Sequence, residues 1–396
     1  MKHIIYLGSV CSNEELQELS GASIAGNNMQ WNILNELSKY DDVVLDIYSL
    51  LSIASFPKDK KLFVKKKRKE IAAGLYVTQV PFINIPILKQ ITQQWSLFHY
   101  AQKSIREDSI GLSYNLYMQE GGALVHLKKK YGIKTMAILA DLPIDDNYSR
   151  KGFTKILYNF FFKISKKYIL DCKNIIVLNK HAIDEFAPEA NYIVVNGGID
   201  VNETSETQQR NILEKNIVYT GALTEYSGII QLIDAIKLVR GEIVLDIYGD
   251  GPLREYVIKC ASECERIKYR GKVSNLEMRK IQKKAWLLVN PRPVDDAIAR
   301  VTFPSKIFEY MISGRPVLTT RHNAFDNEML KYVYTIENNS VKSIVEAIES
   351  ILSLQNEELD IRGQRAKRYV IDEFNWTVQT RKIYDFISKI LDREQQ

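Results

Sequence analysis

Short apolar runs alternate along the chain with longer segments whose apolar residues recur at helical spacing. Ile4 to Leu7 is the first such run, and a helical pattern from about Asn27 to Lys39 follows it after a glycine-rich stretch. Because this alternation is typical of parallel strands joined by helices, it predicts an α/β domain. Further strands are expected at residues 42–50, 75–78, 113–118, 135–139, 175–178 and 191–195, and helices at 90–105, 124–130 and 153–170.

The same alternation returns in the second half, after a polar stretch from Asn202 to Lys215 that is typical of a linker. A chain of 396 residues is long enough for two domains of ordinary size. The pattern therefore predicts a first domain over residues 1–200 and a second over 201–379. In the second, strands are expected at 217–220, 243–248, 267–269, 286–290 and 316–320, and helices at 229–239, 253–260, 275–283 and from 337 onward.

The stretch from Phe303 to Val317 holds the candidate chemistry. Pro304 is expected to begin a helix and Gly314 to end it, because a first-turn proline gives up an amide that has no partner anyway. Lys306 would lie in the first turn, beyond the carboxyl end of a strand, where free amides and the helix dipole favour an anion. Glu309, one turn further, would accept hydrogen bonds from sugar hydroxyls. Phosphate followed by hydroxyls is what a nucleotide sugar presents.

Four ordered motifs of the second half resemble the family 4 retaining glycosyltransferases, in the Phe-Pro-Ser-Lys variant common among bacterial polysaccharide transferases. The resemblance implies the GT-B fold: two Rossmann-like, doubly wound domains that face each other across a cleft, with a C-terminal helix over residues 380–396 crossing back to the first domain. It also implies a hexosyltransferase or other glycosyltransferase activity. The motifs are Tyr219 to Leu223 with Gly228, Leu245 to Gly251, Tyr269 to Val273, and Phe303 to Val317.

The resemblance further implies which residues serve the reaction. The first domain would bind a glycan or lipid-linked glycan acceptor, and the second a nucleoside diphosphate sugar, with UDP favoured over GDP. No cofactor or metal is expected. The residues expected to be catalytic are Asp141, Arg292 and Lys306. Those expected to bind the donor are Gly26, Gly221, Gly249, Asp250, Gly251, Lys272, Val273, Phe303, Pro304, Ser305 and Glu309.

Two of the first domain's site residues have competing interpretations. Asp141 ends the strand at 135–139 and would face the acceptor, but an N-cap or turn role is the alternative. Gly26 closes a glycine-rich loop that would let the backbone approach a ligand, or it merely permits a turn with positive φ.

Three positions depart from the family pattern. The family's arginine and lysine on the donor diphosphate are replaced by Ala222 and Ser227, and its first cleft glutamate by Val301. Because a buried diphosphate without cations is costly, other groups must compensate. The candidates are Lys306, Arg292 and Arg300 for the phosphates and Asp295 and Asp296 for the sugar. The alternative function is a catalytically degenerate GT-B protein that acts as a binding partner of an active transferase.

Charge and composition indicate a cytoplasmic protein with a basic surface. The formal net charge is +6, and Lys58 to Lys69 holds eight basic residues and one acidic residue. Nucleic acid is not expected to be the partner, because no recognition helix or zinc-finger spacing accompanies the run. An anionic membrane surface is the candidate partner, helped by the basic, aromatic helix at 153–170, although a solvated loop and a core helix are the alternatives. The four cysteines are expected to be reduced, and no apolar run is long enough to span a membrane.

Overall fold

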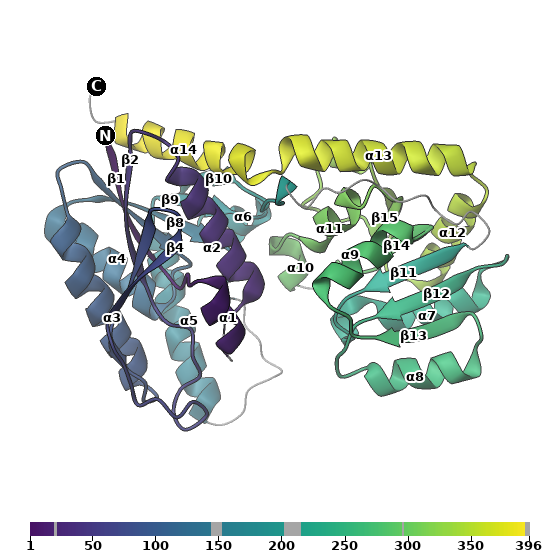
Figure 1. Ribbon diagram of the computed structural model, residues 1–396, viewed down its shortest axis with the longest axis horizontal. Helices are drawn as coiled ribbons and strands as arrows, with labels where there is room; N and C mark the ends of the chain where they lie inside the picture. The colour runs from purple at the N-terminus through teal and green to yellow at the C-terminus, as the bar shows by residue number, and fades with distance from the viewer. Residues whose placement is uncertain (20–21, 144–152, 202–214, 295–296, 393–396) are drawn as a thin grey trace. The chain divides into compact units, whose positions relative to one another are not determined.

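The computed structural model describes residues 1–19, 22–143, 153–201, 215–294 and 297–392. The chain forms two compact units. Unit 1 comprises Met1–Gly197 together with Trp376–Gln396, and unit 2 comprises Gly198–Asn375. Each unit is an α/β structure with its own sheet (Figure 1).

Unit 1 is built on a sheet with the strand order β10-β9-β8-β7-β1-β2-β5-β4. Neighbouring strands are parallel, apart from the antiparallel pair of β4 and β5 at one edge. A separate two-stranded ladder joins β3 and β6. The strands are β1 (Lys2–Gly8), β2 (Val43–Ser49), β3 (Phe63–Val64), β4 (Lys67–Ala72), β5 (Leu75–Gln79), β6 (Phe82–Ile83), β7 (Ser109–Tyr114), β8 (Lys134–Leu139), β9 (Asn174–Val177) and β10 (Asn191–Val194).

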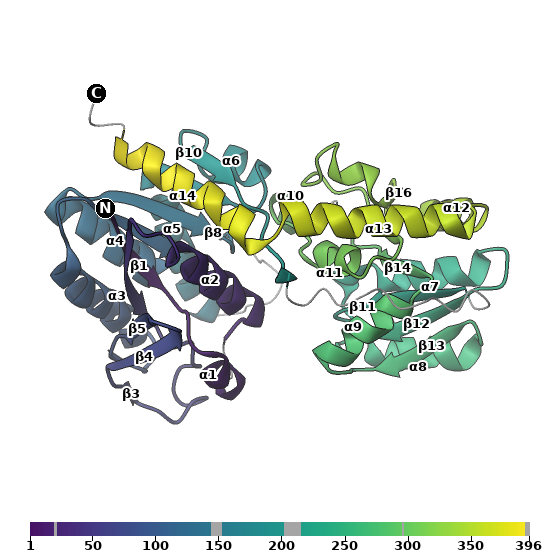
Figure 2. The same cartoon turned by 45° about the horizontal axis from the view of Figure 1, so that its top comes forward.

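Helices cover both faces of this sheet. On one face α3, α4 and α5 pack side by side, and on the other α14 packs against α2 (Figure 2). The core on the α14 side joins apolar residues of β1, β7 and α2 to residues near the C-terminus, including Ile383 and Phe386. The helices are α1 (Asn13–Glu18), α2 (Ile24–Leu37), α3 (Leu88–Ala101), α4 (Met118–Tyr131), α5 (Phe153–Asp171), α6 (His181–Phe186) and α14 (Trp376–Asp392), with a 3-10 turn at Gln102–Ser104.

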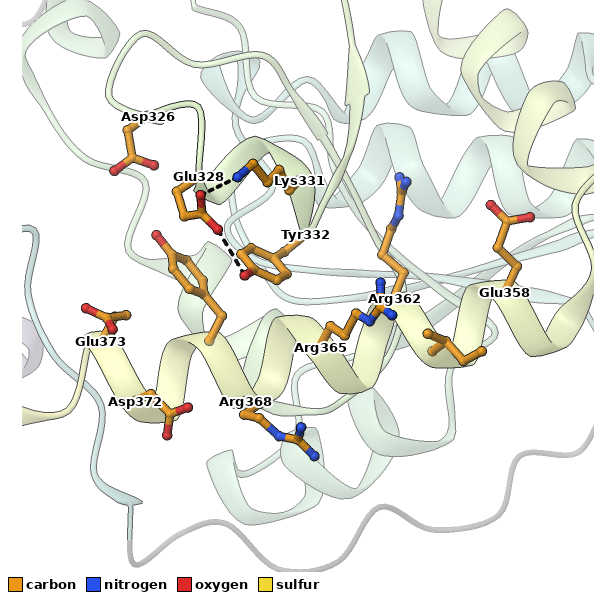
Figure 3. Close-up of a pocket in the computed structure, with 12 residues that line it drawn as sticks. Asp326, Glu328, Lys331, Tyr332, Glu358, Arg362, Arg365, Arg368, Asp372 and Glu373 are labelled. Atoms are coloured by element: carbon orange, nitrogen blue, oxygen red, sulfur yellow. Dashed lines mark hydrogen bonds and ion pairs between the residues drawn. The ribbon is translucent and has the colours of Figure 1, made fainter.

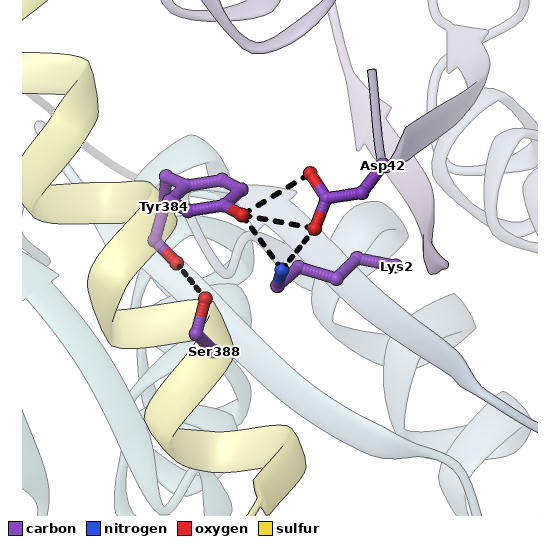
Figure 4. A network of polar contacts seen from close by, with 4 residues as sticks. All are labelled: Lys2, Asp42, Tyr384 and Ser388. Atoms are coloured by element: carbon purple, nitrogen blue, oxygen red, sulfur yellow. Dashed lines mark hydrogen bonds and ion pairs between the residues drawn. The ribbon is translucent and has the colours of Figure 1, made fainter. Parts of the chain in front are cut away.

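A polar network also attaches α14 to unit 1 (Figure 4). Lys2 Nζ bonds to Asp42 and donates to the Tyr384 hydroxyl over 2.8 Å. That hydroxyl in turn donates to Asp42 Oδ2 over 2.9 Å, and the ring of Tyr384 stacks on Tyr40 at 4.0 Å. The last helix is thus joined to the start of β1 and the turn before β2.

Unit 2 has a fully parallel sheet with the order β13-β12-β11-β14-β15-β16. Its core contains aliphatic residues from most of these strands and from the helices around them. The strands are β11 (Asn216–Thr220), β12 (Val244–Tyr248), β13 (Ile267–Gly271), β14 (Leu287–Asn290), β15 (Val317–Thr320) and β16 (Tyr334–Ile336). The helices are α7 (Ile229–Leu238), α8 (Arg254–Glu263), α9 (Asn275–Lys284), α10 (Ala297–Val301), α11 (Lys306–Ile312), α12 (Val341–Leu352) and α13 (Asn356–Glu373), with 3-10 turns η3 (Glu225–Ser227) and η4 (Met329–Lys331).

The predicted elements are present, but several of their bounds are corrected. The helix expected at 124–130 begins earlier, at Met118. The strand expected at 113–118 lies at Ser109–Tyr114, because Asn115 takes φ +61° and ends the extended run. The basic segment from Lys58 to Lys69 is not simply a loop, since β3 and the start of β4 lie in it. The helix expected to begin at Asn27 begins at Ile24, capped by the Ser23 side chain. Within the described ranges, no helix combines the length and the apolar character needed to span a bilayer.

Candidate active site

The loops named as donor-binding gather at the carboxyl edge of the unit 2 sheet. Gly221 follows β11, and the Gly249 and Asp250 loop follows β12. Main-chain hydrogen bonds tie these loops together: the Gly221 amide donates to Tyr248 O over 2.9 Å, and the Leu223 amide to Asp250 O over 3.0 Å. Because all strands of the sheet are parallel, this edge is where an α/β fold collects its ligands.

Three glycines in these loops are required by close backbone contacts. Gly249 has φ +144°, and a Cβ there would lie 1.8 Å from the carbonyl oxygen of Gly221. Gly251 has φ +155°, and its Cβ would lie 2.5 Å from Leu223 O. Gly228, at φ +74°, would place a Cβ 2.0 Å from the carbonyl oxygen of the loop after β14. These positions therefore exclude any side chain, and the loops after three strands pack backbone against backbone.

The helix that carries the Phe-Pro-Ser-Lys motif begins two residues later than expected. α11 starts at Lys306 with Ser305 as its N-cap, and Pro304 lies before it. The Ile307 amide donates to Pro304 O over 2.9 Å, so this first turn is tighter than an α-helical one. Gly314 follows the helix at φ +75°, which confirms the predicted end.

Tyr310 fixes α11 to the end of β11. Its buried hydroxyl accepts a hydrogen bond from the Thr220 amide over 3.0 Å and donates to the Thr220 carbonyl over 3.1 Å. Burial raises the pKa of this phenol, so it remains a neutral hydrogen-bonding group. The contact links two segments 90 residues apart, and it holds the helix beside the Gly221 loop.

The side chains around α11 differ in their access to a ligand. Lys306 Nζ and Glu309 Oε2 lie 3.9 Å apart, and 36% and 62% of their side chains are exposed. Ser305 is exposed as well. Phe303 and Pro304 are buried, with the Phe303 ring stacked on another phenylalanine of the same segment at 4.9 Å. Contacts of Phe303 with a donor would therefore involve its backbone only.

The remaining donor-side residues lie in loops at the same edge. Arg292 is half-buried, two residues after the end of β14. Lys272 is exposed and Val273 half-buried, just after β13. The nearby Asp295 and Asp296 lie outside the described residues.

The departures from the family pattern do not provide a replacement cation. Ala222 is exposed and carries no polar group. The Ser227 hydroxyl donates to the Thr224 carbonyl over 2.6 Å, so it serves the local turn. Val301 is buried at 2% exposure. Arg300 is exposed but already has an interaction within the chain.

In unit 1, Asp141 lies just after β8 and is held by Asn115. The Asn115 side chain donates to Asp141 Oδ2 over 3.1 Å and accepts the amide of Asp141 over 2.9 Å. Asp141 is exposed at the carboxyl edge of the sheet, in a bend. Gly26 was expected in a loop, but it lies in the first turn of α2. A Cβ at this position would be 3.2 Å from the Tyr114 hydroxyl.

Several buried polar residues of unit 1 were not singled out from the sequence. Glu120, in the first turn of α4, is 4% exposed, and its Oε2 has no hydrogen-bond partner. Burial raises the pKa of Glu120 to about 8, so at neutral pH it is mainly protonated. Burial likewise raises the pKa of Tyr6 and of Tyr114. An acidic residue in the first turn of this helix was the available signal for these buried polar groups.

A cavity of about 1010 Å³ in unit 2 lies apart from the predicted residues (Figure 3). It lies between η4 and α13, and Tyr332 and Tyr369 stack within it at 4.4 Å. Both acidic and basic side chains line it, so it lacks the uniform positive charge that a diphosphate requires. They are Asp326, Glu328, Lys331, Glu358, Arg362, Arg365, Arg368, Asp372 and Glu373.

Metal-binding chemistry is not evident in the described ranges, where no three His, Cys, Asp or Glu residues cluster. The cysteines Cys11, Cys172, Cys260 and Cys264 are free thiols.

Comparisons with known proteins agree with this architecture. Residues 214–354 match the family described as "Glycosyl transferases group 1". Among solved structures, sucrose-phosphate synthase from Thermosynechococcus elongatus is 13% identical with a TM-score of 0.69, covering 99% of this chain and 100% of that chain. HepE from Anabaena, solved with UDP, is 14% identical with a TM-score of 0.65, covering 98% and 100%. The lipopolysaccharide outer core galactosyltransferase WaaB is 14% identical with a TM-score of 0.65, covering 98% and 99%.

No curated protein matches the chain in sequence. The largely parallel sheets of the two units and the likeness over almost the whole chain show that the protein has the GT-B fold, with a glycosyltransferase group 1 segment in its second unit.

Proposed function

We propose that the protein transfers a sugar from a nucleoside diphosphate sugar to a glycan or lipid-linked glycan acceptor, with retention of anomeric configuration. The observation that carries this proposal is the family match over residues 214–354. That segment contains the loops at the carboxyl edge of the unit 2 sheet and the whole of α11.

In this reaction the bond from the anomeric carbon to the diphosphate breaks, and its electron pair leaves with the diphosphate. The acceptor oxygen forms the new bond to the anomeric carbon, and its hydroxyl proton passes to the leaving diphosphate. Lys306 and Arg292 would stabilise the growing charge on the leaving diphosphate. Glu309 would bind the ribose, the glycine loops would border the base, and Asp141 would contact the acceptor hydroxyl.

We favour UDP as the nucleotide, since HepE, a structural neighbour over the whole chain, was solved with UDP. We further propose cell-surface or exopolysaccharide biosynthesis as the pathway, with the protein in the cytoplasm at the inner face of the membrane. The motif variant and the basic segment from Lys58 to Lys69 support this location.

The test is to incubate the purified chain with a panel of UDP- and GDP-sugars and to follow nucleotide release and sugar products by mass spectrometry. We expect one UDP-sugar to be hydrolysed slowly without acceptor, and Lys306→Ala to reduce the rate. A protein that binds UDP in calorimetry but releases no nucleotide from any donor would instead be the degenerate binding partner.

A further inference from the structure

Unit 1 has an exposed apolar surface on the first turns of α3 and the adjoining β3–β6 ladder. We call it the α3 patch and define it as Phe63, Ile83, Ile85, Leu88, Ile91 and Trp95, whose exposure runs from 36% for Ile83 to 61% for Trp95. Single exposed apolar residues are ordinary, but a contiguous group on a monomer marks a contact surface.

The members of the α3 patch are contiguous in the fold. Phe63 pairs directly with Ile83 across the ladder, so both side chains lie on the same face. The Ile83 amide donates to Thr92 Oγ1 over 3.1 Å, which places the ladder against α3. Leu88, Ile91 and Trp95 are spaced by three and four residues along that helix and therefore share its outer face.

The opposite face of α3 is already used by the core. Leu97 and Ala101 are fully buried, and α3 packs closely against α4. The helix is thus apolar on both sides, whereas a surface helix of a globular protein usually has a polar outer face. Folding of unit 1 does not account for the outer residues.

Charge around the patch indicates what covers it. From Lys58 to Trp95 the chain has nine basic residues and two acidic ones. Lys60, Lys61 and Lys65 flank Phe63, are exposed and make no salt bridge in the part of the chain that the structure describes. Exposed apolar side chains that include a tryptophan and are flanked by lysines are the composition of a surface that enters the headgroup region of an anionic bilayer.

We propose that unit 1 binds an anionic lipid bilayer by inserting the α3 patch, while the surrounding lysines contact lipid headgroups. This deepens the proposed function, because a bilayer is where a lipid-linked acceptor lies. The proposal also differs from a purely electrostatic attachment through the basic segment. Inserted apolar area continues to contribute to the binding free energy when salt screens the charges.

The test uses the full chain and vesicles of phosphatidylcholine with or without phosphatidylglycerol, without donor or acceptor, so that it is independent of transfer activity. The triple variant Leu88→Gln, Ile91→Gln, Trp95→Gln should bind anionic vesicles at least about tenfold more weakly, because interfacial binding scales with inserted apolar area. The matched control replaces three similarly exposed residues of unit 2 by Leu238→Gln, Leu276→Gln and Ile361→Gln and should bind like the natural chain. Unchanged thermal melting shows that each variant is folded.

Two further readouts distinguish insertion into the bilayer from a purely electrostatic contact. Trp95 fluorescence should shift to the blue on anionic vesicles, and Trp95→Phe should abolish the shift while keeping most of the binding. The natural chain should keep part of its binding at high salt, and the triple variant should not. Equal vesicle binding by the triple variant would overturn the proposal. The proposal would also be overturned if the natural chain sedimented as a dimer and the triple variant as a monomer. That result would show that a second copy of the chain covers the α3 patch.

Discussion

Lys306 and Glu309 form only a weak ion pair in the free protein. Their charged atoms are 3.9 Å apart, the Glu309 side chain is mostly exposed and the Lys306 side chain is partly exposed. An exposed pair of this kind contributes at most about 1 kcal/mol to stability. Both groups are therefore available to bind a ligand at little cost to the fold.

Lys306→Ala and Glu309→Ala should each weaken UDP binding by about tenfold or more, the loss expected when a charged hydrogen-bond partner is removed. Titration calorimetry measures the affinity, and thermal melting should change little. Lys280→Ala, at another exposed lysine of unit 2, is the control. Unchanged affinity in both variants would remove these residues from the site.

Arg292 is the candidate for the phosphate contact that Ala222 and Ser227 do not make. A guanidinium offers a planar fork to two phosphate oxygens, whereas a lysine offers one point charge. Arg292→Lys should therefore lower kcat strongly, although the charge is kept, and it should leave the melting temperature nearly unchanged. Restored turnover on adding Ala222→Arg to Arg292→Ala would show that the two positions serve one phosphate, and full activity of Arg292→Ala alone would rule the contact out.

Glu120 makes stability depend on pH in an unusual direction. Burial raises the pKa of Glu120 to about 8, above its value of about 4.5 in the unfolded chain. At a pH between these two pKa values, the folded chain keeps a proton that the unfolded chain has lost. The free energy of unfolding should fall as pH rises through this window, by up to about 1.4 kcal/mol per pH unit. Glu120→Gln lacks this dependence. Its stability relative to the natural chain, measured by denaturant unfolding, should increase from about pH 4.5 to pH 8; a constant difference would contradict the assignment.

At the scale of elements, α11 is a short helix that the buried side chain of Tyr310 joins to the sheet by hydrogen bonds. Tyr310 bonds to both the amide and the carbonyl of Thr220, at the end of β11. Because Lys306 and Glu309 lie on the same helix, this contact helps to fix the position of the two side chains that we propose to bind the donor.

Tyr310→Phe should destabilise the protein by about 1–3 kcal/mol, because the buried Thr220 amide loses its partner. The same variant should also weaken UDP binding, although Tyr310 itself need not touch the ligand. Chemical denaturation and calorimetry give the two numbers, with Tyr226→Phe at an exposed position as the control. Equal stability of Tyr310→Phe and the natural chain would show that the contact does not hold α11.

Most elements followed from the sequence, since regular apolar spacing predicts both strand and helix. The spacing of Lys306 and Glu309 likewise predicted a shared face. The errors in element bounds have local causes, such as the φ of Asn115 and the Ser23 cap, whereas contacts between segments distant in sequence could not be predicted. Thr220 cannot be recognised as the partner of Tyr310 from either segment alone, and the buried Phe303 ring contacts Phe325, 22 residues further along the chain.

At the scale of the whole chain, unit 1 is discontinuous in sequence. Phe386 and Ile387, on α14, are buried in the same core as residues of β1 and α2. Phe386→Ala should therefore destabilise unit 1 by about 3–5 kcal/mol, as expected for removing a large core side chain. Hydrogen exchange should quicken in β1 and β2 and stay unchanged in β11 and β12. Ser388→Ala on the same helix is the control, and faster exchange confined to unit 2 would contradict the prediction.

The return of α14 has a consequence for synthesis on the ribosome. Unit 2 is one continuous segment, so it is able to complete its fold soon after leaving the exit tunnel. Unit 1 begins to emerge first, yet it waits for Trp376–Asp392 before the side of its sheet next to α2 is covered. The nascent chain thus exposes the aliphatic residues of that side while all of unit 2 is translated. A premature stop codon just before Trp376 would leave this side of the sheet permanently accessible to chaperones and proteases.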